Sequence, residues 1–143
     1  MSCVLGFDVG SRLIGVAVGN RVTASARALA VVSVHEGGPD WATLDDLHRQ
    51  WLPDTLVVGL PLALDGTEQP ATRLARRFAE HLRQRYRAPV ALVDEQYSSQ
   101  EAAQRFAEAR AAGTRRRRDA AAIDAQAAAV ILERWLAATT ASE

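Results

Sequence analysis

The sequence predicts an α/β fold in which five strands form one mixed sheet flanked by helices, in the order βββαβαβαα. The chain opens with short apolar runs of the length of a strand. One more such run follows each of the first two amphipathic stretches, which have the length of a helix. Tight turns separate the first three runs, which is typical of an antiparallel meander. Helical segments separate the later runs, which favours strands one, four and five running parallel through crossovers.

The first three strands are predicted at residues 3–9, 13–18 and 27–34. The first of them is almost wholly apolar apart from Asp8, as expected of a central strand that is covered on both faces. Gly10-Ser11-Arg12 predicts a turn after it, and Gly19-Asn20 closes the second strand. These three strands therefore form the antiparallel part of the sheet.

Helices and strands alternate in the next part of the chain. Asp40 can cap a helix that reaches about Leu52, and the apolar run Thr55–Leu60 predicts the fourth strand. Pro70 fits the first turn of a second helix, and Val90–Val93 predicts the fifth strand. The apolar stripe of that second helix consists of Leu74, Phe78, Leu82 and Tyr86.

Two further helices are predicted after the fifth strand. Ser98-Ser99-Gln100-Glu101 has the form of a capping box, which opens a helix to about Ala112. The final helix spans roughly Asp119 to Ala138. The chain shows neither an internal repeat nor a linker, so we expect one domain over residues 1–143, with a frayed tail from about residue 139.

Composition narrows the class of protein. Apolar residues make up 48% and charged residues 24%, which is typical of a globular protein. No apolar run reaches the roughly 20 residues of a membrane helix, and the chain enters its first strand without a charged leader, so we expect a cytoplasmic protein. The single cysteine, Cys3, excludes an internal disulfide and a cysteine-based zinc site.

All 17 basic residues are arginines, and they are unevenly distributed although the net charge is zero. The segment 73–87 holds six arginines and one acid, Glu80, which we interpret as a solvated helix face. The run Arg115-Arg116-Arg117-Arg118 is different, because Asp119 is the only local acid for four adjacent like charges. We expect this run to contact the phosphates of a nucleic acid.

Acidic side chains gather at one edge of the predicted sheet. Asp8 ends the first strand, Asp65 lies in the loop after the fourth, and Glu95 ends the fifth. Ligands bind in α/β sheets at this carboxyl edge. Asp124 lies on the apolar stripe of the final helix, where a carboxylate is costly unless it is paired or coordinates a cation. Several acids without a histidine cluster favour Mg²⁺ or Mn²⁺, and the roles of Asp65 and Asp94 stay open.

The glycines of the first two strands permit another interpretation. The turn at Asp8-Val9-Gly10, together with the second strand, could bind a nucleotide phosphate as in actin-like ATPases. The spacing of Gly10, Gly15 and Gly19 fits neither G-x-G-x-x-G nor the Walker A pattern, and hairpin geometry alone also explains these glycines. An ATP-binding domain is therefore an alternative from the sequence alone.

Four motifs lie in register over nearly the whole chain. They are Phe7-Asp8-Val9-Gly10 with Ile14–Gly19, Val58–Leu62 with Asp65–Gln69, Asp94-Glu95 with Ser98–Ala102, and Ile123-Asp124 with Ala127–Leu132. In this order they resemble the signatures of the YqgF family, also called RuvX. Four matches in register make a chance resemblance improbable.

The resemblance implies an RNase H-like fold, related to that of the RuvC resolvases, and a nuclease activity. It implies metal ligands at Asp8, Glu95 and Asp124, with Asp8 bridging two ions. Two roles are proposed for the family: maturation of the 5′ end of pre-16S ribosomal RNA, and Holliday-junction resolution. The family usually has an arginine where this sequence has Gln96, and Arg12 is a candidate to supply the missing charge.

We therefore expect a metal-dependent endonuclease that processes pre-16S rRNA with Mg²⁺ or Mn²⁺. Arg12 and Arg115-Arg116-Arg117-Arg118 would bind the nucleic acid. Junction resolution is the alternative, and it needs two active sites and hence a homodimer. A nucleic-acid-binding module without catalysis is a further alternative, favoured by the arginine runs and by Gln96.

Overall fold

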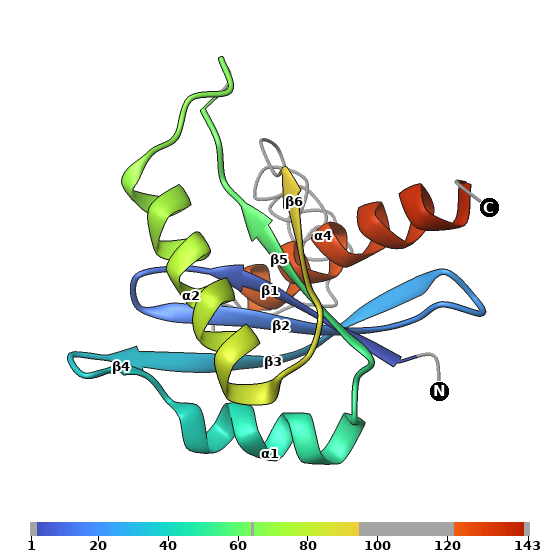
Figure 1. Cartoon of the computed structure of the whole chain (residues 1–143), viewed down its shortest axis with the longest axis horizontal. Helices are drawn as coiled ribbons and strands as arrows, with labels where there is room; N and C mark the ends of the chain where they lie inside the picture. Colours follow the sequence, from blue (N-terminus) through green and yellow to red (C-terminus); the bar gives the residue numbers. More distant parts are fainter. Residues whose placement is uncertain (1–2, 64, 95–121, 142–143) are drawn as a thin grey trace, which may run out of the picture.

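The computed structural model describes residues 3–63, 65–94 and 122–141. Its described strands form one sheet in the order β4-β3-β2-β1-β5-β6 (Figure 1). Their bounds are β1 Cys3–Val9, β2 Leu13–Asn20, β3 Ser25–His35, β4 Gly38–Pro39, β5 Thr55–Leu60 and β6 Val90–Asp94. The neighbours from β4 to β1 are antiparallel, whereas β1, β5 and β6 are parallel. The predicted meander and the predicted parallel strands are both confirmed.

The strand β4 is a difference from the expected five-stranded sheet. The five predicted strands do not include this segment, but Gly38 pairs with His35 and Pro39 pairs with Val34. Gly38 has a φ of +116°, which only glycine adopts at low cost, and this lets the chain reverse directly after β3. Proline is acceptable in β4 because an edge strand has one side that pairs with no neighbour.

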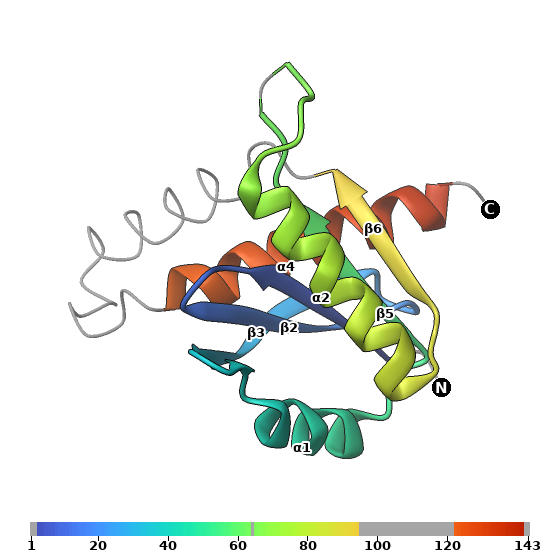
Figure 2. The same cartoon turned by 60° about the vertical axis from the view of Figure 1, so that its left-hand side comes forward.

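Of the helices that the structure describes, two cover one face of the sheet and the third covers the other (Figures 1 and 2). The first face carries α1, Trp41–Trp51, and α2, Pro70–Tyr86. The Asp40 carboxylate caps α1, because it accepts hydrogen bonds from the Thr43 N–H at 3.3 Å and the Thr43 hydroxyl at 2.8 Å. The predicted start of α1 is thereby confirmed.

The opposite face carries α4, which spans Ala122–Ala141. It continues beyond the predicted end at Ala138, and the Thr139 hydroxyl donates to the Trp135 carbonyl at 2.9 Å. The predicted start of this helix and the predicted helix at 98–112 lie outside the described residues. Within the described ranges, no helix combines the length and the apolar character needed to cross a membrane.

Large side chains fill the face between the sheet and helices α1 and α2. Its buried members include Leu5, Phe7, Ile14, Val16, Leu56, Val58, Phe78 and Leu82. The Phe78 ring meets the Phe7 ring edge-on, with 5.4 Å between centroids, and it stacks on Trp41 at 5.7 Å. We call this the wide face, because these rings and branched side chains hold the helices away from the strands.

Alanines and aliphatic side chains, with no aromatic ring among the fully buried ones described, line the opposite face between the sheet and α4. The buried members of this cluster are Val4, Ala17, Val57, Ala128, Ala129, Ile131, Leu132 and Leu136. A Cβ atom on Gly6 would lie 3.0 Å from the Leu132 Cβ and 3.3 Å from the Ala128 carbonyl oxygen. We call this the close face, because the helix backbone lies almost directly on β1.

Candidate active site at the carboxyl edge of the sheet

Asp8 is the last residue but one of β1, and it is half-buried. Side chains alternate along a strand, and Leu5 and Phe7 belong to the wide face while Val4 belongs to the close face. Asp8 therefore lies on the close face, beyond Gly6. Its register partner on β2 is Gly15, which has no side chain to cover the carboxylate.

The turn after β1 needs glycine at position 10. The Gly10 N–H donates to the Leu13 carbonyl at 2.9 Å, and a Cβ atom on Gly10 would lie 2.7 Å from that same oxygen. Real Cβ atoms do not approach an oxygen so closely, so any side chain here would force the turn to open. The sequence identifies Gly10 as a turn residue, and the structure adds that it fixes the backbone directly after Asp8-Val9.

Helix α4 runs along β1 in a regular register. Gly19, the partner of Val4, approaches Leu132 and Leu136, whereas Gly6 approaches Ala128 and Leu132. Two residues forward along β1 therefore correspond to one turn backward along α4. The backbone at position 124 lies in this helix, one turn before Ala128, while its side chain lies outside the described residues.

Strand β6 ends at the same edge of the sheet as β1 and β5. Asp94 is its last residue, is exposed, and pairs in register with Leu60 at the end of β5. Ala91 and Val93 pack against the close-face cluster. Glu95, the predicted ligand that follows in the sequence, lies outside the described residues.

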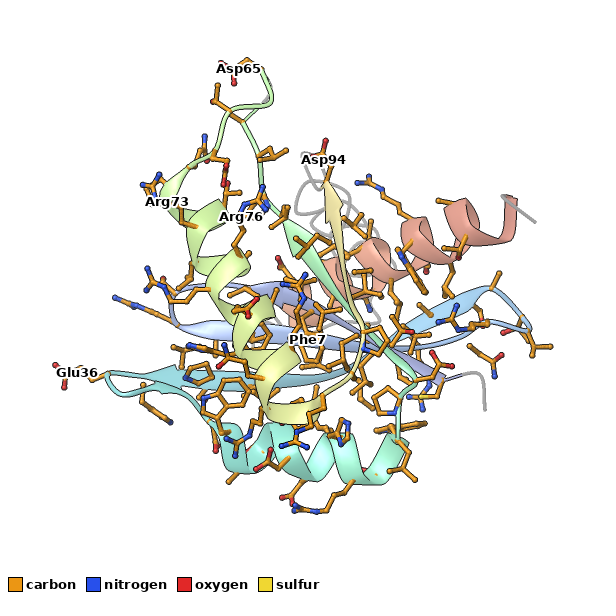
Figure 3. All side chains as sticks on the ribbon, in the orientation of Figure 1. Phe7, Glu36, Asp65, Arg73, Arg76 and Asp94 are labelled. Atoms are coloured by element: carbon orange, nitrogen blue, oxygen red, sulfur yellow. The ribbon has the colours of Figure 1, made fainter. Side chains whose placement is uncertain are left out.

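Asp65 takes part in the turn of its own loop. Its carboxylate accepts hydrogen bonds from the Thr67 hydroxyl at 2.7 Å and the Thr67 N–H at 3.0 Å. These two bonds lower the pKa of Asp65, the hydroxyl having the larger effect. Figure 3 shows Asp65 at the tip of a loop that projects beyond the end of β6, where Asp94 lies. The structure favours the turn interpretation of Asp65.

Arg12 is exposed in the turn that joins β1 to β2. Its carbonyl accepts a hydrogen bond from the Val34 N–H at 2.8 Å, which ties the turn to β3. Arg12 is thus an exposed cationic residue of the turn that follows the strand carrying Asp8. The run Arg115-Arg116-Arg117-Arg118 lies outside the described residues.

The donor chemistry of this edge fits a hard divalent cation. Asp8 offers carboxylate oxygens, which Mg²⁺ and Mn²⁺ prefer over nitrogen and sulfur ligands. In the part of the chain that the structure describes, no three acidic, histidine or cysteine side chains form a metal-binding group. Two of the three predicted ligand side chains, those of Glu95 and Asp124, lie outside that part.

Comparison with solved structures defines the class of fold. The chain is similar to Thermus thermophilus RuvC in complex with a Holliday junction substrate, with a TM-score of 0.58, 18% identity, and coverage of 98% of this chain and 96% of that one. It is also similar to the fowlpox virus resolvase with its substrate Holliday junction DNA, with a TM-score of 0.53, 8% identity, and coverage of 94% and 98%. The predicted RNase H-like fold of the RuvC type is thereby confirmed.

The sequence defines the family. The model of the RuvX family, described as Holliday junction resolvase, matches residues 2–138, and the chain belongs to this family. A protein of Xanthomonas axonopodis pv. citri (strain 306) named "Putative pre-16S rRNA nuclease" is 65% identical over 94% of this chain and 87% of its own length. A protein with the same name from Xanthomonas oryzae pv. oryzae (strain PXO99A) is 64% identical over the same shares.

Proposed function

We propose that this chain is a metal-dependent endonuclease that hydrolyses a phosphodiester bond during maturation of the 5′ end of pre-16S rRNA in the cytoplasm. The observation that carries the proposal is the position of Asp8, a half-buried carboxylate on the close face at the carboxyl edge of the sheet. Membership of the RuvX family and the names of relatives at 64–65% identity support the reaction and its substrate.

The proposed metal ligands are Asp8, Glu95 and Asp124. The register of α4 supports the pairing of Asp8 with Asp124: one more step from Gly6 and Ala128 leads to Asp8 on the strand and to position 124 on the helix. Glu95 directly follows Asp94 at the end of β6, the second strand over from β1. All three acids would thus converge at one edge.

Each group of the chain has a separate task in this proposal. Bound Mg²⁺ or Mn²⁺ supplies stabilisation of the negative charge that develops on the phosphate and lowers the pKa of a water molecule. The three carboxylates hold and orient the ions, and the rigid turn at Gly10 fixes the strand end that carries Asp8. Arg12 and Arg115-Arg116-Arg117-Arg118 bind backbone phosphates and so position the scissile bond.

Holliday-junction resolution is the second candidate function. The family description names this activity, and the solved structures of similar fold include resolvases with their junction substrates. Cutting two strands of a junction symmetrically requires two active sites, so this function predicts a homodimer. The names of the more similar relatives favour the rRNA substrate.

The test is cleavage by the purified protein with Mg²⁺ or Mn²⁺, on a pre-16S rRNA 5′-leader fragment and on a synthetic four-way junction. Asp8→Asn removes one charge from the proposed ligand and should abolish cutting. Asp46→Asn is the matched control, because Asp46 is an exposed residue of α1 that pairs with Arg49. This control should cut like the wild type, and a chelator should stop both.

The substrate that is cut decides the role. Cutting of the leader supports rRNA maturation, and preferential cutting of the junction by a dimer would replace it with resolution. Equal cutting by Asp8→Asn and the wild type would contradict the proposed site. Tight binding of both substrates without cutting would indicate a binding module, and saturable binding of free ATP with Mg²⁺ would indicate an ATP-binding domain.

A further inference from the structure

A cavity lies beside the turn that follows Asp8, on the wide-face side of the sheet edge. It has a volume of about 430 Å³ and is enclosed by the β1–β2 turn and the first two turns of α2. Val9 and Leu74 contribute apolar lining, Ser11 lines it from the β1–β2 turn, and Arg73 and Arg77 line the wall that α2 forms. Two cations and a hydroxyl thus surround a space next to the candidate active site.

The two arginines of this wall differ from most other arginines of the described chain. Ion pairs with acids hold Arg21, Arg49, Arg76, Arg83 and Arg85. Arg27 instead lies over the Trp51 ring. Among the described residues, the side chains of Arg73 and Arg77 have neither an acidic partner nor an aromatic one. The part of the chain that the structure describes therefore leaves both charges available to a ligand.

Arg73 and Arg77 place two like charges side by side on the helix surface. They lie four residues apart on one helix, where like charges repel each other. Their stems are about 6 Å apart along the helix axis, so both guanidinium groups can reach one phosphate or two successive phosphates of a strand. Arg12 is exposed and directly follows Ser11 in the turn, so it adds a further positive charge to this part of the surface.

The position of the cavity relates it to Asp8. Val9 lines the cavity on the wide-face side, whereas Asp8, the preceding residue, faces the close side. A nucleic-acid strand that crosses the turn at Gly10-Ser11 would therefore place one phosphate near Asp8 and a flanking phosphate in the cavity. The two positions lie on opposite sides of the same strand end.

An acidic residue on the other side of the cavity disfavours the passage of a nucleic-acid strand in that direction. A neighbouring cavity of about 250 Å³ shares Val9, Leu74 and Arg77 and reaches the β3–β4 hairpin, where it is lined by Glu36. Figure 3 shows Glu36 at the tip of that hairpin and Arg73 near the amino end of α2. A polyanion is repelled at the first position and attracted at the second.

We propose that Arg73, Arg77 and Ser11 form a binding site for a backbone phosphate of the nucleic acid that flanks the cleaved bond. The inference rests on the proposed function, because it takes the ligand to be the substrate strand. The two guanidinium groups bind the non-bridging oxygens, and the Ser11 hydroxyl donates a further hydrogen bond. The site holds the substrate in register with Asp8 and leaves the chemistry to the carboxylates.

The test is binding of a labelled pre-16S leader RNA without divalent metal, titrated at several salt concentrations. The variant is Arg73→Gln with Arg77→Gln. The matched control is Arg83→Gln with Arg87→Gln, which removes two charges from the far end of the same helix, outside the cavity. For the first variant the slope of log affinity against log salt should fall by about 1 for each lost phosphate contact, and the control should keep the wild-type slope.

A substrate series locates the contact. Replacing single phosphates of the RNA by neutral methylphosphonates should weaken wild-type binding at one or two positions beside the cleavage site. The same replacements should have no effect on the Arg73→Gln, Arg77→Gln variant, because its contact is already lost. If that variant does not fold by circular dichroism, the two single variants are titrated in the same way.

The outcomes separate this inference from the proposed function. A salt slope equal to that of the control, or a methylphosphonate effect that survives in the variant, would overturn the phosphate site even if Asp8→Asn abolishes cutting. A reduced slope supports the site even if no cutting is found. Micromolar binding of free ATP that disappears in Arg73→Gln, Arg77→Gln would assign the cavity to a free nucleotide and would overturn the inference.

Discussion

The two faces of the sheet are packed in opposite ways. On the wide face, aromatic rings and branched side chains separate the strands from α1 and α2. On the close face, Gly6 lets the backbone of α4 lie almost directly on β1, with Ala128 at the contact. Both faces bury large apolar side chains, but in the described part of the chain only the close face brings helix backbone against a strand at a glycine.

This difference assigns different tasks to the two faces. A layer of long side chains can adjust to small changes by altering rotamers, so its main contribution is hydrophobic stabilisation. A helix that touches a strand through Cβ atoms and carbonyl oxygens has little freedom to shift. The close face is therefore suited to hold Asp8 at a fixed distance from residues of α4, which the proposed metal site requires.

The largest expected effects come from matched leucine truncations on the two faces. Leu82 of α2 and Leu132 of α4 are both fully buried, so each change to alanine should cost about 2–5 kcal/mol of unfolding free energy. Urea denaturation measures these losses. Assayed where both variants are folded, Leu82→Ala should cut like the wild type, whereas Leu132→Ala should cut more slowly because α4 shifts relative to Asp8. Equal cutting rates for the two variants would show that the two faces do not differ in how they affect the site.

A smaller effect is expected from adding one methyl group to the close face at Gly6. The new Cβ would meet the Leu132 Cβ at 3.0 Å and the Ala128 carbonyl oxygen at 3.3 Å. Both atoms are fixed to the backbone of α4, so they cannot move without the helix. Gly6→Ala should therefore cost about 1–3 kcal/mol, measured as a shift in the urea midpoint, and should slow cutting. A neutral or stabilising Gly6→Ala would show that α4 can move freely.

Gly19→Ala is the control for that change. A Cβ on Gly19 would meet the Leu132 Cδ2 at 2.9 Å and the Leu136 Cδ1 at 3.0 Å, which are the ends of flexible side chains. Rotamer changes can relieve these contacts, and alanine also restricts the unfolded chain, so the net cost should be about 1 kcal/mol or less. A larger loss of stability for Gly19→Ala than for Gly6→Ala would contradict the view that the helix backbone is the rigid part of this contact.

The smallest effect concerns the surface of the wide face, where Asp45 links α1 to α2. Its carboxylate accepts hydrogen bonds from Arg85 at 2.7 and 2.8 Å and from the Tyr86 hydroxyl at 2.7 Å. Hydrogen bonding by Arg85, followed by that of Tyr86, lowers the pKa of Asp45 well below its usual range.

The sign of the pH dependence follows from this lowered pKa. The stabilisation is fully present above the unfolded pKa of about 3.9 and is lost as the pH falls from there toward the folded value. The melting temperature of Asp45→Asn should therefore fall less than that of the wild type between about pH 5 and pH 3. Parallel curves would show that the link contributes nothing, and Asp46→Asn, an exposed pair on the same helix, serves as the control.

Much of the fold follows from local patterns in the sequence. The apolar runs gave the principal strands, and Asp40 and Pro70 marked the starts of α1 and α2 because capping and proline geometry act within one turn. Strand β4 was missed because two residues carry no periodic pattern, and their pairing with Val34 and His35 is a tertiary event. The end of α4 was predicted three residues too early, because the sequence there contains no glycine or proline to mark where the helix stops.

The candidate site could be predicted only in part. Asp8 was found because a lone acid in an apolar strand is unusual, and the structure places it at the expected edge. The roles of Glu95 and Asp124 stay predictions. Arg73 and Arg77 could not be told apart from the other arginines of α2, because the acids that neutralise Arg76 and Arg85 come from other segments of the chain.

The contact of Gly6 with Ala128 and Leu132 also has a consequence for the growing protein. A ribosome releases β1 and β2 early, and α4 follows only after β5 and β6. Until then, the close-face residues of β1 and β2, next to Asp8, lack the helix that covers them in the folded protein. On the proposed function, nuclease activity would begin only once residues 122–141 have left the ribosome and packed on the sheet. The enzyme would therefore be inactive during its own synthesis.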